Sequence, residues 1–314
     1  FEGEYAGSRF DTDISDDRRK ESDHALRAKV FGRLERSDWE IGYRYYGPEY
    51  ASIANPLGTQ DREEVNLGGG IRFDESSLRA SLLHGRDNVK KDPLLPVIQN
   101  TTGAVNYSLT AAGWPAVFVS GSQTLQESFD EPVGVPEIEN TTTTLSFGAS
   151  QAGERWHLAP FYSYTRFDDR SAGTDNDSDT HVFTVAGGIR PTDGSAVNPS
   201  VTYSHIDLES TGVATRTWQA ALSAVVGFWE NQLNVNATAS WLDNQTSDGA
   251  VHTTTWSGIC QLNWSVEKYL PGEGRQTLSL RGQYNLTDDR VAGSEQEDYI
   301  VYAVFSFGLP YNSQ

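Results

Sequence analysis

The chain has 314 residues with a formal net charge of −19 at pH 7, and 37% of its residues are hydrophobic, with a mean hydropathy of −0.52. The acidic balance argues against a nucleic-acid partner, and the single cysteine, Cys260, excludes an intrachain disulfide and a cysteine-based zinc site. No apolar run reaches the roughly 18 residues of a transmembrane helix. The chain starts at Phe1 and contains no methionine, so we expect an exported protein whose leader sequence has been removed.

The first part of the chain alternates apolar and polar residues with the two-residue period of β-strands. Strands are predicted at residues 1–9, 26–34, 39–45, 65–73 and 78–82. Short connections at 36–38 and 74–76 alternate with longer ones, of which the first, 11–23, is rich in aspartate. Strands joined in this way are expected to pair antiparallel.

The same alternation resumes after residue 140. Further strands are predicted at residues 143–149, 156–164, 183–189, 197–203, 218–228, 233–241, 254–264, 278–284 and 299–307. The clearest hairpin is 218–241, where Trp218 and Trp241 mark one end of the two arms and Phe228 marks the other. Small aliphatic residues lie between these aromatics and the polar face is uncharged, which is typical of strands between lipid and water.

One face of the predicted strands avoids charge. From the second strand onward, no position on this outward face carries Asp, Glu, Lys or Arg, although 21% of the chain is charged. Because an arginine at the middle of a bilayer costs about 2–4 kcal/mol, we expect this face to meet hydrocarbon. Pro160 and Pro199 lie within predicted strands, where each removes a possible ladder hydrogen bond, so we expect bulges there.

A sheet in lipid has to close on itself, because an open edge would leave unpaired backbone amides and carbonyls. The predicted fold is therefore all-β: a closed antiparallel transmembrane β-barrel of about fourteen strands, with residues 1–314 as a single domain. An even number of strands places both termini on the side of the short turns, with the long loops opposite.

These residues resemble the Gram-negative outer-membrane β-barrels, over nearly the whole chain and through pattern rather than motif. Within that family the chain is most similar to the monomeric fourteen-stranded, porin-like channels such as OmpG and the cyclodextrin-transporting porin. The resemblance implies the bacterial outer membrane, a periplasmic N-terminus, short periplasmic turns, long extracellular loops and contact with outer-membrane lipid or lipopolysaccharide. It also implies a monomer, whereas the residues themselves leave monomer and trimer open.

The longest connection, residues 86–139, exceeds an ordinary loop. It is apolar around Trp114 and Phe118, so we expect it to fold into or over the barrel mouth with these aromatics near the narrowest point. Alternatively, residues 104–110 and 116–122 form a further extracellular hairpin, or two more barrel strands that would bring the total to sixteen.

The face opposite the hydrocarbon is expected to line a lumen, since a barrel of this size is too wide for side chains to fill. One wall is basic and carries Arg27, Lys29, Arg33, Arg44, Arg72 and Arg79 against Glu35, Glu40 and Glu64. The strands from 197–203 to 254–264 contribute mostly Asn, Gln, Ser and Thr. The aromatic residues Phe31, Tyr46, Phe161 and Phe167 point the same way and could stack on sugar rings.

Such a lumen favours passive diffusion of oligosaccharides, because guanidinium groups bind vicinal oxygens while amides both donate and accept hydrogen bonds. Neutral sugars, including cyclic ones by analogy with the cyclodextrin channel, are the first expectation. Anionic oligosaccharides are the second, and the basic wall supports them. Two alternatives remain: the charged residues only satisfy one another, or the barrel is structural with a closed lumen.

Two chemical motifs fail. Residues 175–179 match the start of a calcium loop, but Thr180 stands where glycine is required and Ala186 where the bidentate glutamate belongs, so no metal site is expected. The histidines on the outward face near the loops are His24, His84, His181, His205 and His252. A lipid-active enzyme would need such groups beside a nucleophile, but no Gly-x-Ser-x-Gly motif accompanies them, so we expect neither catalysis nor a cofactor.

Overall fold

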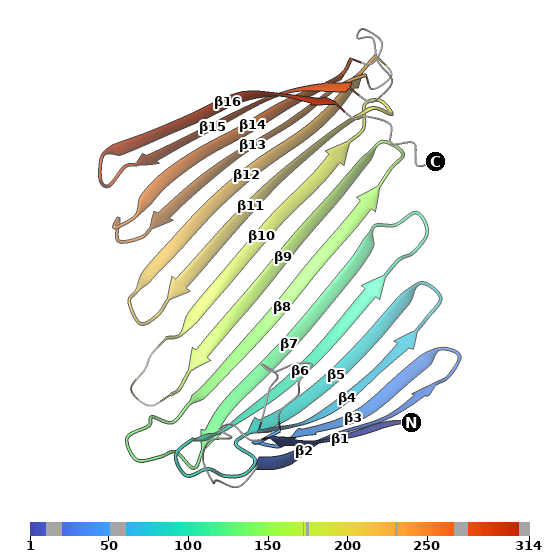
Figure 1. The fold of residues 1–314 in the computed structure, drawn as a ribbon, viewed down its shortest axis with the longest axis vertical. Coiled ribbons are helices and arrows are strands. Elements are labelled where there is room, and N and C mark those ends of the chain that lie inside the picture. Colours follow the sequence, from blue (N-terminus) through green and yellow to red (C-terminus); the bar gives the residue numbers. More distant parts are fainter. Residues whose placement is uncertain are drawn as a thin grey trace. The chain divides into compact units, whose positions relative to one another are not determined.

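The computed structural model describes residues 1–10, 21–50, 61–171, 173, 176–229, 232–266 and 276–307. These residues form sixteen antiparallel β-strands in a sheet whose order follows the sequence (Figure 1). The strands are β1 (Glu2–Phe10), β2 (Glu21–Arg33), β3 (Ser37–Tyr46), β4 (Arg62–Arg72), β5 (Ser76–Asp87), β6 (Val97–Leu109), β7 (Ala116–Phe129), β8 (Glu139–Ala152), β9 (Trp156–Asp169), β10 (Ser178–Ile189), β11 (Ser195–Leu208), β12 (Val213–Phe228), β13 (Leu233–Thr246), β14 (His252–Ser265), β15 (Gln276–Asp289) and β16 (Ser294–Phe307). No helix among the described residues is long and apolar enough to span a membrane.

Two of these strands, β6 and β7, lie within the segment 86–139. β6 pairs with β5 on one side and with β7 on the other. The expectation of a long loop that folds into a lumen is therefore wrong, and the alternative of two further strands is confirmed. The pattern concealed them because Gly103, Gly121 and Gln123 interrupt their apolar face.

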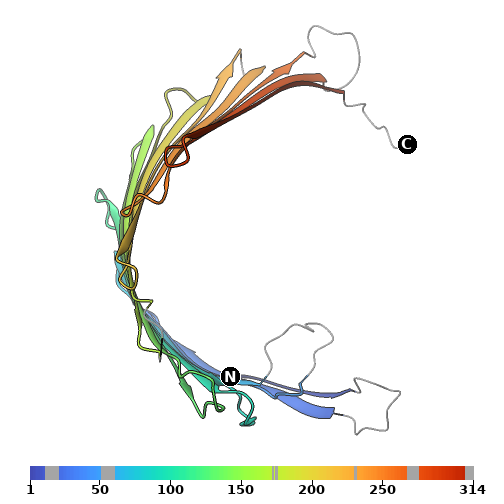
Figure 2. The ribbon, with the colours of Figure 1, turned by 90° about the vertical axis from the view of Figure 1, so that its left-hand side faces the viewer.

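The chain divides into two compact units, Phe1–Phe147 with Tyr164–Asp179, and Gly148–Ser163 with Thr180–Gln314. Figure 2 shows the strands of either unit close to edge-on, as a single layer. In the second unit Tyr203 lies opposite Trp218, and Trp241 lies opposite both Ala220 and Trp256. Because directly opposite residues share a face, this register confirms the apolar face predicted for the hairpin 218–241.

The first unit has the same two faces. Ile41 lies opposite Val30 and Leu67, and Leu67 lies opposite Leu82 on the next strand. The strands extend further than predicted. The residues added at their ends bring charged side chains to the apolar face, and only near the ends of the strands. There Glu63 lies opposite Arg86, with 2.5 Å between a carboxylate oxygen and Nε.

The described residues contain almost no hydrophobic core. Ala25, Val97 and Val266 are the only buried hydrophobic residues among them, and none of their large side chains is fully buried. Large apolar side chains on the apolar face remain about half exposed, as shown by Trp256 at 52% and Leu145 at 52%. Since burying one such side chain is worth about 1.5–3 kcal/mol, this face needs a cover that the sheet itself does not supply.

The connections differ in length between the two ends of the strands. In the first unit the loop side carries 47–61, 88–96 and 130–138, and the turn side carries 34–36, 73–75 and 110–115. In the second unit we use the name loop side for the strand ends that are joined by the connections 209–212, 247–251 and 290–293, although these connections are short. The expected contrast between long loops and short turns is therefore confined to the first unit.

Some sequence expectations fall on other parts of the chain. The aspartate-rich connection lies outside the described residues at 11–20, and so does Asp175 of the candidate calcium loop. The bulge expected at Pro199 is absent, because the register between β11 and β12 runs without an offset through Pro199 and Leu222. One proline forfeits a single backbone hydrogen bond, and the remaining pairs of the long ladder hold the register.

We predict that Cys residues replacing Thr102 and Thr124 will form a disulfide, in a background where Cys260 is replaced by serine. These threonines are directly opposite on β6 and β7, and their hydroxyl oxygens lie 3.0 Å apart. The Cα atoms of directly opposite residues are about 4.5–5.5 Å apart, which is within the range of about 4.4–6.8 Å found in disulfides. Mild oxidation followed by non-reducing electrophoresis after cleavage between the two sites measures the bond. A pair at Thr102 and Gln123, which lie on opposite faces, should not cross-link; equal cross-linking of both pairs would contradict the register.

Candidate functional site

The basic side chains predicted to line one wall do share a face in the first unit. Arg27 lies opposite Arg44, and Arg44 opposite Glu64. Further along the same face, Asp38 lies opposite Arg33 and, across Gly70, in the same row as Arg79. On β2, β3 and β4 the same face also carries Lys29, Phe31, Tyr46 and Arg72, because residues two positions apart point to the same side of a strand. We call this whole set of residues the basic wall.

Half of the cations of the basic wall are neutralised by carboxylates of neighbouring strands. Lys29 Nζ lies 2.7 Å from Glu40 Oε2, and Arg79 Nη2 donates to Asp38 Oδ2 at 2.6 Å. Arg44 Nη1 lies 3.8 Å from Glu64 Oε2. The alternative in which charges satisfy one another is therefore correct for these three cations, and they do so within the wall.

Three arginines of the wall have no such partner. Among the described residues, no carboxylate lies within ion-pair distance of Arg27, Arg33 or Arg72. Arg33, Arg72 and Arg79 line one hollow of about 290 Å³ together with Asp38 and Ser77. The lining therefore has an excess of positive charge that can bind an anionic group.

Gly70 keeps this hollow open. A Cβ atom at that position would lie 3.3 Å from Arg79 Nε and 3.4 Å from Asp38 Oδ1. The absence of a side chain thus leaves the guanidinium and carboxylate groups accessible from the polar face.

Two aromatic residues of the wall lie beside polar partners. Lys29 Nζ lies 5.8 Å from the centroid of the Phe31 ring, and both line a second hollow of about 490 Å³. The ring of Tyr46 lies 6.3 Å from that of Tyr50. Phe31 is exposed at 47%, so one face of its ring is free to stack on a solute.

The other predicted aromatics are placed differently from one another. Phe118 on β7 lies opposite Ser108 on the polar face, whereas Trp114 lies in the turn 110–115 and is 75% exposed. Neither belongs to a loop folded over a mouth, so that assignment is wrong. Phe161 and Phe167 lie on the same face of β9 as Thr165. Thr165 shares a hydrogen bond of 3.2 Å with Thr144 on β8.

The hydroxyl and amide side chains that the sequence placed on one face of the second unit do share that face, and several of them form hydrogen bonds across it. The hydroxyl pairs are Thr184 with Thr202 at 3.1 Å, Ser240 with Ser257 at 2.6 Å, and Thr255 with Thr287 at 3.4 Å. Each hydroxyl group that forms one such hydrogen bond still has another donor or acceptor available. The face can therefore exchange hydrogen bonds with a hydroxylated solute.

Sequence reasoning missed a cation on the polar face of the second unit. Arg281 lies opposite Gln261 and Tyr302, and its guanidinium carbon lies 6.0 Å from the centroid of the Tyr302 ring. The parity of β15 places Arg281 on the polar face, and this signal was available in the sequence. Its stacking on Tyr302 depends on the register between β15 and β16, which the sequence does not specify.

The five outward histidines lie on the apolar face near the loop side, as predicted. His84 Nδ1 lies 2.9 Å from Thr101 Oγ1, and His181 Nδ1 lies 2.9 Å from Tyr162 Oη. His205 contacts Asp207 at 2.9 Å. Within the described part of the chain, no group of three or more His, Cys, Asp or Glu side chains could hold a metal ion.

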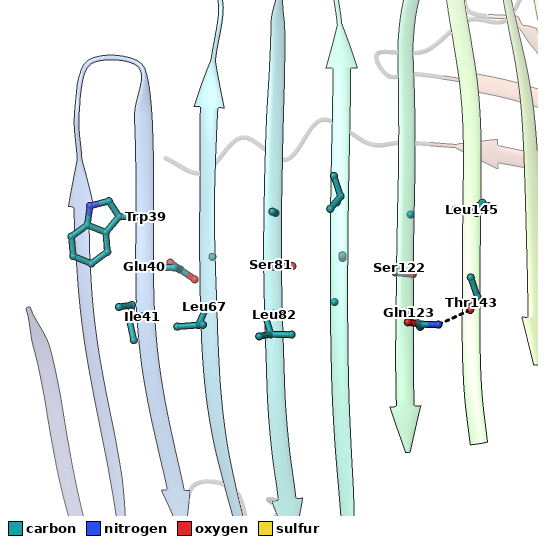
Figure 3. A pocket seen from close by; sticks show the side chains of 16 residues that line it. Trp39, Glu40, Ile41, Leu67, Ser81, Leu82, Ser122, Gln123, Thr143 and Leu145 are labelled. Carbon is teal, nitrogen blue, oxygen red and sulfur yellow. Dashed lines mark hydrogen bonds between the residues drawn. The ribbon is translucent and has the colours of Figure 1, made fainter. Parts of the chain in front are cut away.

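A hollow of about 780 Å³ lies against β3–β8 of the first unit. Ile41, Leu67 and Leu82 project from neighbouring strands on the apolar face (Figure 3). The Gln123 amide donates to Thr143 Oγ1 at 3.4 Å beside them. The hollow is part of the apolar face and does not contribute to the basic wall.

The loop 88–96 is held in place by its own polar groups. Asn88 is 4% exposed, and its amide donates to the carbonyl oxygens of Asp92 and Leu95 at 3.1 and 2.8 Å. Lys90 Nζ donates to Glu49 Oε1 at 2.6 Å, and this hydrogen bond raises the pKa of Lys90. The loop is thereby tied to the neighbouring connection at 47–50.

No protein-family model and no curated protein matches the chain. It is similar to the solved structure of OmpTdeltaL8, a loop L8 deletion mutant of OmpT, an outer membrane protein of Vibrio cholerae, at 8% identity and a TM-score of 0.34, covering 97% of this chain and 99% of that one. It is also similar to OccK10 (OpdN) of Pseudomonas aeruginosa at 13% identity and a TM-score of 0.29, covering 99% of this chain and 98% of that one.

Proposed function

We propose that the chain is a transmembrane β-barrel of a bacterial outer membrane and lets polar solutes diffuse through its lumen. The observation that carries this proposal is the pair of opposite faces on each strand: one apolar and half exposed, the other polar, with almost no core among the described residues. Hydrocarbon covers the apolar face in this proposal, and water covers the polar one.

Closure follows from the cost of an open edge. The order of the sheet begins with β1 and ends with β16, and in lipid the outer backbone groups of these strands need partners. In the proposed barrel, closure of the sheet on itself supplies them. Sixteen strands then enclose an aqueous channel rather than a packed interior.

Oligosaccharides are the solutes that the polar face suits best. The hydroxyl and amide groups of the second unit offer both donors and acceptors, and Phe31 offers a ring for stacking. Neutral sugars, including cyclic ones of the kind carried by the cyclodextrin porin, are the first candidates. Passage requires neither catalysis nor a cofactor, and a monomer suffices.

Anionic oligosaccharides are the second candidates. Arg27, Arg33 and Arg72 support them, because these guanidinium groups have no carboxylate partner among the described residues. A carboxylate or sulfate on the solute would bind them through charge-assisted hydrogen bonds.

We predict that Leu222→Arg will destabilise the protein in liposomes by about 2–4 kcal/mol, the cost of an arginine at the bilayer midplane. Leu222 lies in the middle of β12 on the apolar face, and the neighbouring Ala221 lies on the polar face. Ala221→Arg is therefore the matched control and should change stability little. Denaturant unfolding in liposomes measures both; equal losses would contradict the assignment of the faces.

We predict stepwise ionic conductance in a planar lipid bilayer, with blocking events when a neutral cyclic oligosaccharide is added. Binding of the sugar to the polar face transiently excludes ions from the lumen. Block by charged sugars alone would transfer the proposal to the second candidates. Insertion without any conductance would point to a closed structural barrel, and lipid hydrolysis abolished by one His→Ala change would point to an enzyme.

We predict that the double variant Arg33→Gln/Arg72→Gln will shift the reversal potential in a salt gradient toward cation selectivity. The two substitutions remove the unneutralised charge from the 290 Å³ hollow. The control is Arg36→Gln/Arg155→Gln, which removes the same charge from turns between strands. An equal shift in both variants would show that net charge, rather than the wall, sets selectivity.

A further inference from the structure

A row of side chains runs across the second unit near the loop side, and its members on β11, β12, β13 and β14 lie directly opposite one another. His205 lies opposite Arg216, Arg216 opposite Gln245, and Gln245 opposite His252. The rings of His181 and His205 lie 6.5 Å apart at one end, and Arg290 Nη1 lies 3.4 Å from His252 Nε2 at the other. The row, hereafter the His–Arg row, is His181, His205, Arg216, Gln245, His252 and Arg290.

The row lies on the apolar face, between the aromatics and the loops. Trp218 is the next residue of β12 on that face, one step of about 6.6 Å toward the middle of the strand. Its ring lies 4.6 Å from that of Tyr203, which neighbours His205 in the same way. Aromatic pairs of this kind mark the boundary between hydrocarbon and headgroups.

Both ends of the row have carboxylate neighbours, and Arg216 and Gln245 in its centre have none within ion-pair or hydrogen-bond distance among the described residues. His205 Nε2 lies 2.9 Å from Asp207, and Arg290 Nε lies 3.5 Å from Asp288. Arg216 and Gln245 in the centre are both exposed. Neither makes a side-chain hydrogen bond or ion pair with a described residue, so their donors are accessible from outside the protein.

We propose that Arg216 and Gln245 bind the phosphate group of a phosphorylated membrane lipid. A guanidinium binds phosphate through two parallel hydrogen bonds, and the amide of Gln245 adds a third donor from the next strand. This inference rests on the proposed location in a membrane, where a lipid-facing arginine is tolerated near the interface but not at the midplane.

The surface beneath the row favours a lipid over free phosphate. A headgroup bound at Arg216 places its acyl chains along Trp218, Ala220 and Leu222, which continue the same face toward the middle of β12. Leu222 is 45% exposed there, so the chains gain apolar contact together with the charge-assisted hydrogen bonds. Inorganic phosphate gains only the latter.

The test uses the full chain in a nonionic detergent, titrated with phosphatidylglycerol and followed by native mass spectrometry. We expect Arg216→Gln to weaken binding at least fivefold and Arg216→Lys to weaken it less, since lysine keeps the charge but loses the bidentate geometry. Arg190→Gln is the matched control, because Arg190 is an exposed arginine beyond the other end of β10. An unchanged melting temperature shows that each variant is folded.

Each outcome decides between the alternatives. Equal binding to the Arg216 and Arg190 variants would overturn the proposal, and so would equal binding of a glycosyl diacylglycerol with the same acyl chains but no phosphate. Displacement of the lipid by millimolar inorganic phosphate would make the site a phosphate site without lipid preference, which also overturns it. A protein that is monodisperse without detergent would instead refute the membrane location on which the inference depends.

Discussion

Hydrogen bonds between neighbouring backbones are the constraint on which this structure depends. Each unit is a single layer of strands, so the pairs within the layer have to satisfy the backbone groups without help from a packed core. Cross-strand side-chain pairs such as Thr102 with Thr124 add about 0.2–1 kcal/mol each. Their sum is modest beside the apolar area left open, so the environment on the apolar face contributes much of the stability.

The sequence predicts the strands of this layer wherever apolar and polar residues alternate clearly. Alternation in the hairpin 218–241 indicates both strands and both faces correctly, because Trp218, Leu222 and Trp241 all lie on one face. The same reasoning fails for β6 and β7, where glycine and glutamine occupy positions on the apolar face. Strand pairing does not require an apolar residue at each such position, so backbone order extends beyond the hydrophobic signal.

The candidate site is predictable to the level of a face and no further. Parity places Arg33, Arg72 and Arg79 together, but the register between strands decides that Asp38 neutralises Arg79 and leaves the other two free. Register also decides that Arg281 stacks on Tyr302. A shift of one residue would turn each of these side chains to the opposite face, so ion pairing belongs to the assembled sheet and not to any strand alone.

The apolar stretch on the outward face of β12 has a length that can be compared with the thickness of the hydrocarbon layer of a membrane. Phe228 and Trp218 bound its apolar stretch, and Arg216 follows Trp218 on the same face. Ten steps of about 3.3 Å each span roughly 33 Å along the strand. In a barrel whose strands are tilted by about 40° from the barrel axis, this length corresponds to a height of about 25 Å along that axis. That height equals the apolar band of outer-membrane barrels, about 25 Å. On the proposed location in a membrane, the order from Leu222 through Trp218 to Arg216 corresponds to the passage from hydrocarbon through the interface to water, with the His–Arg row at the depth of the headgroups.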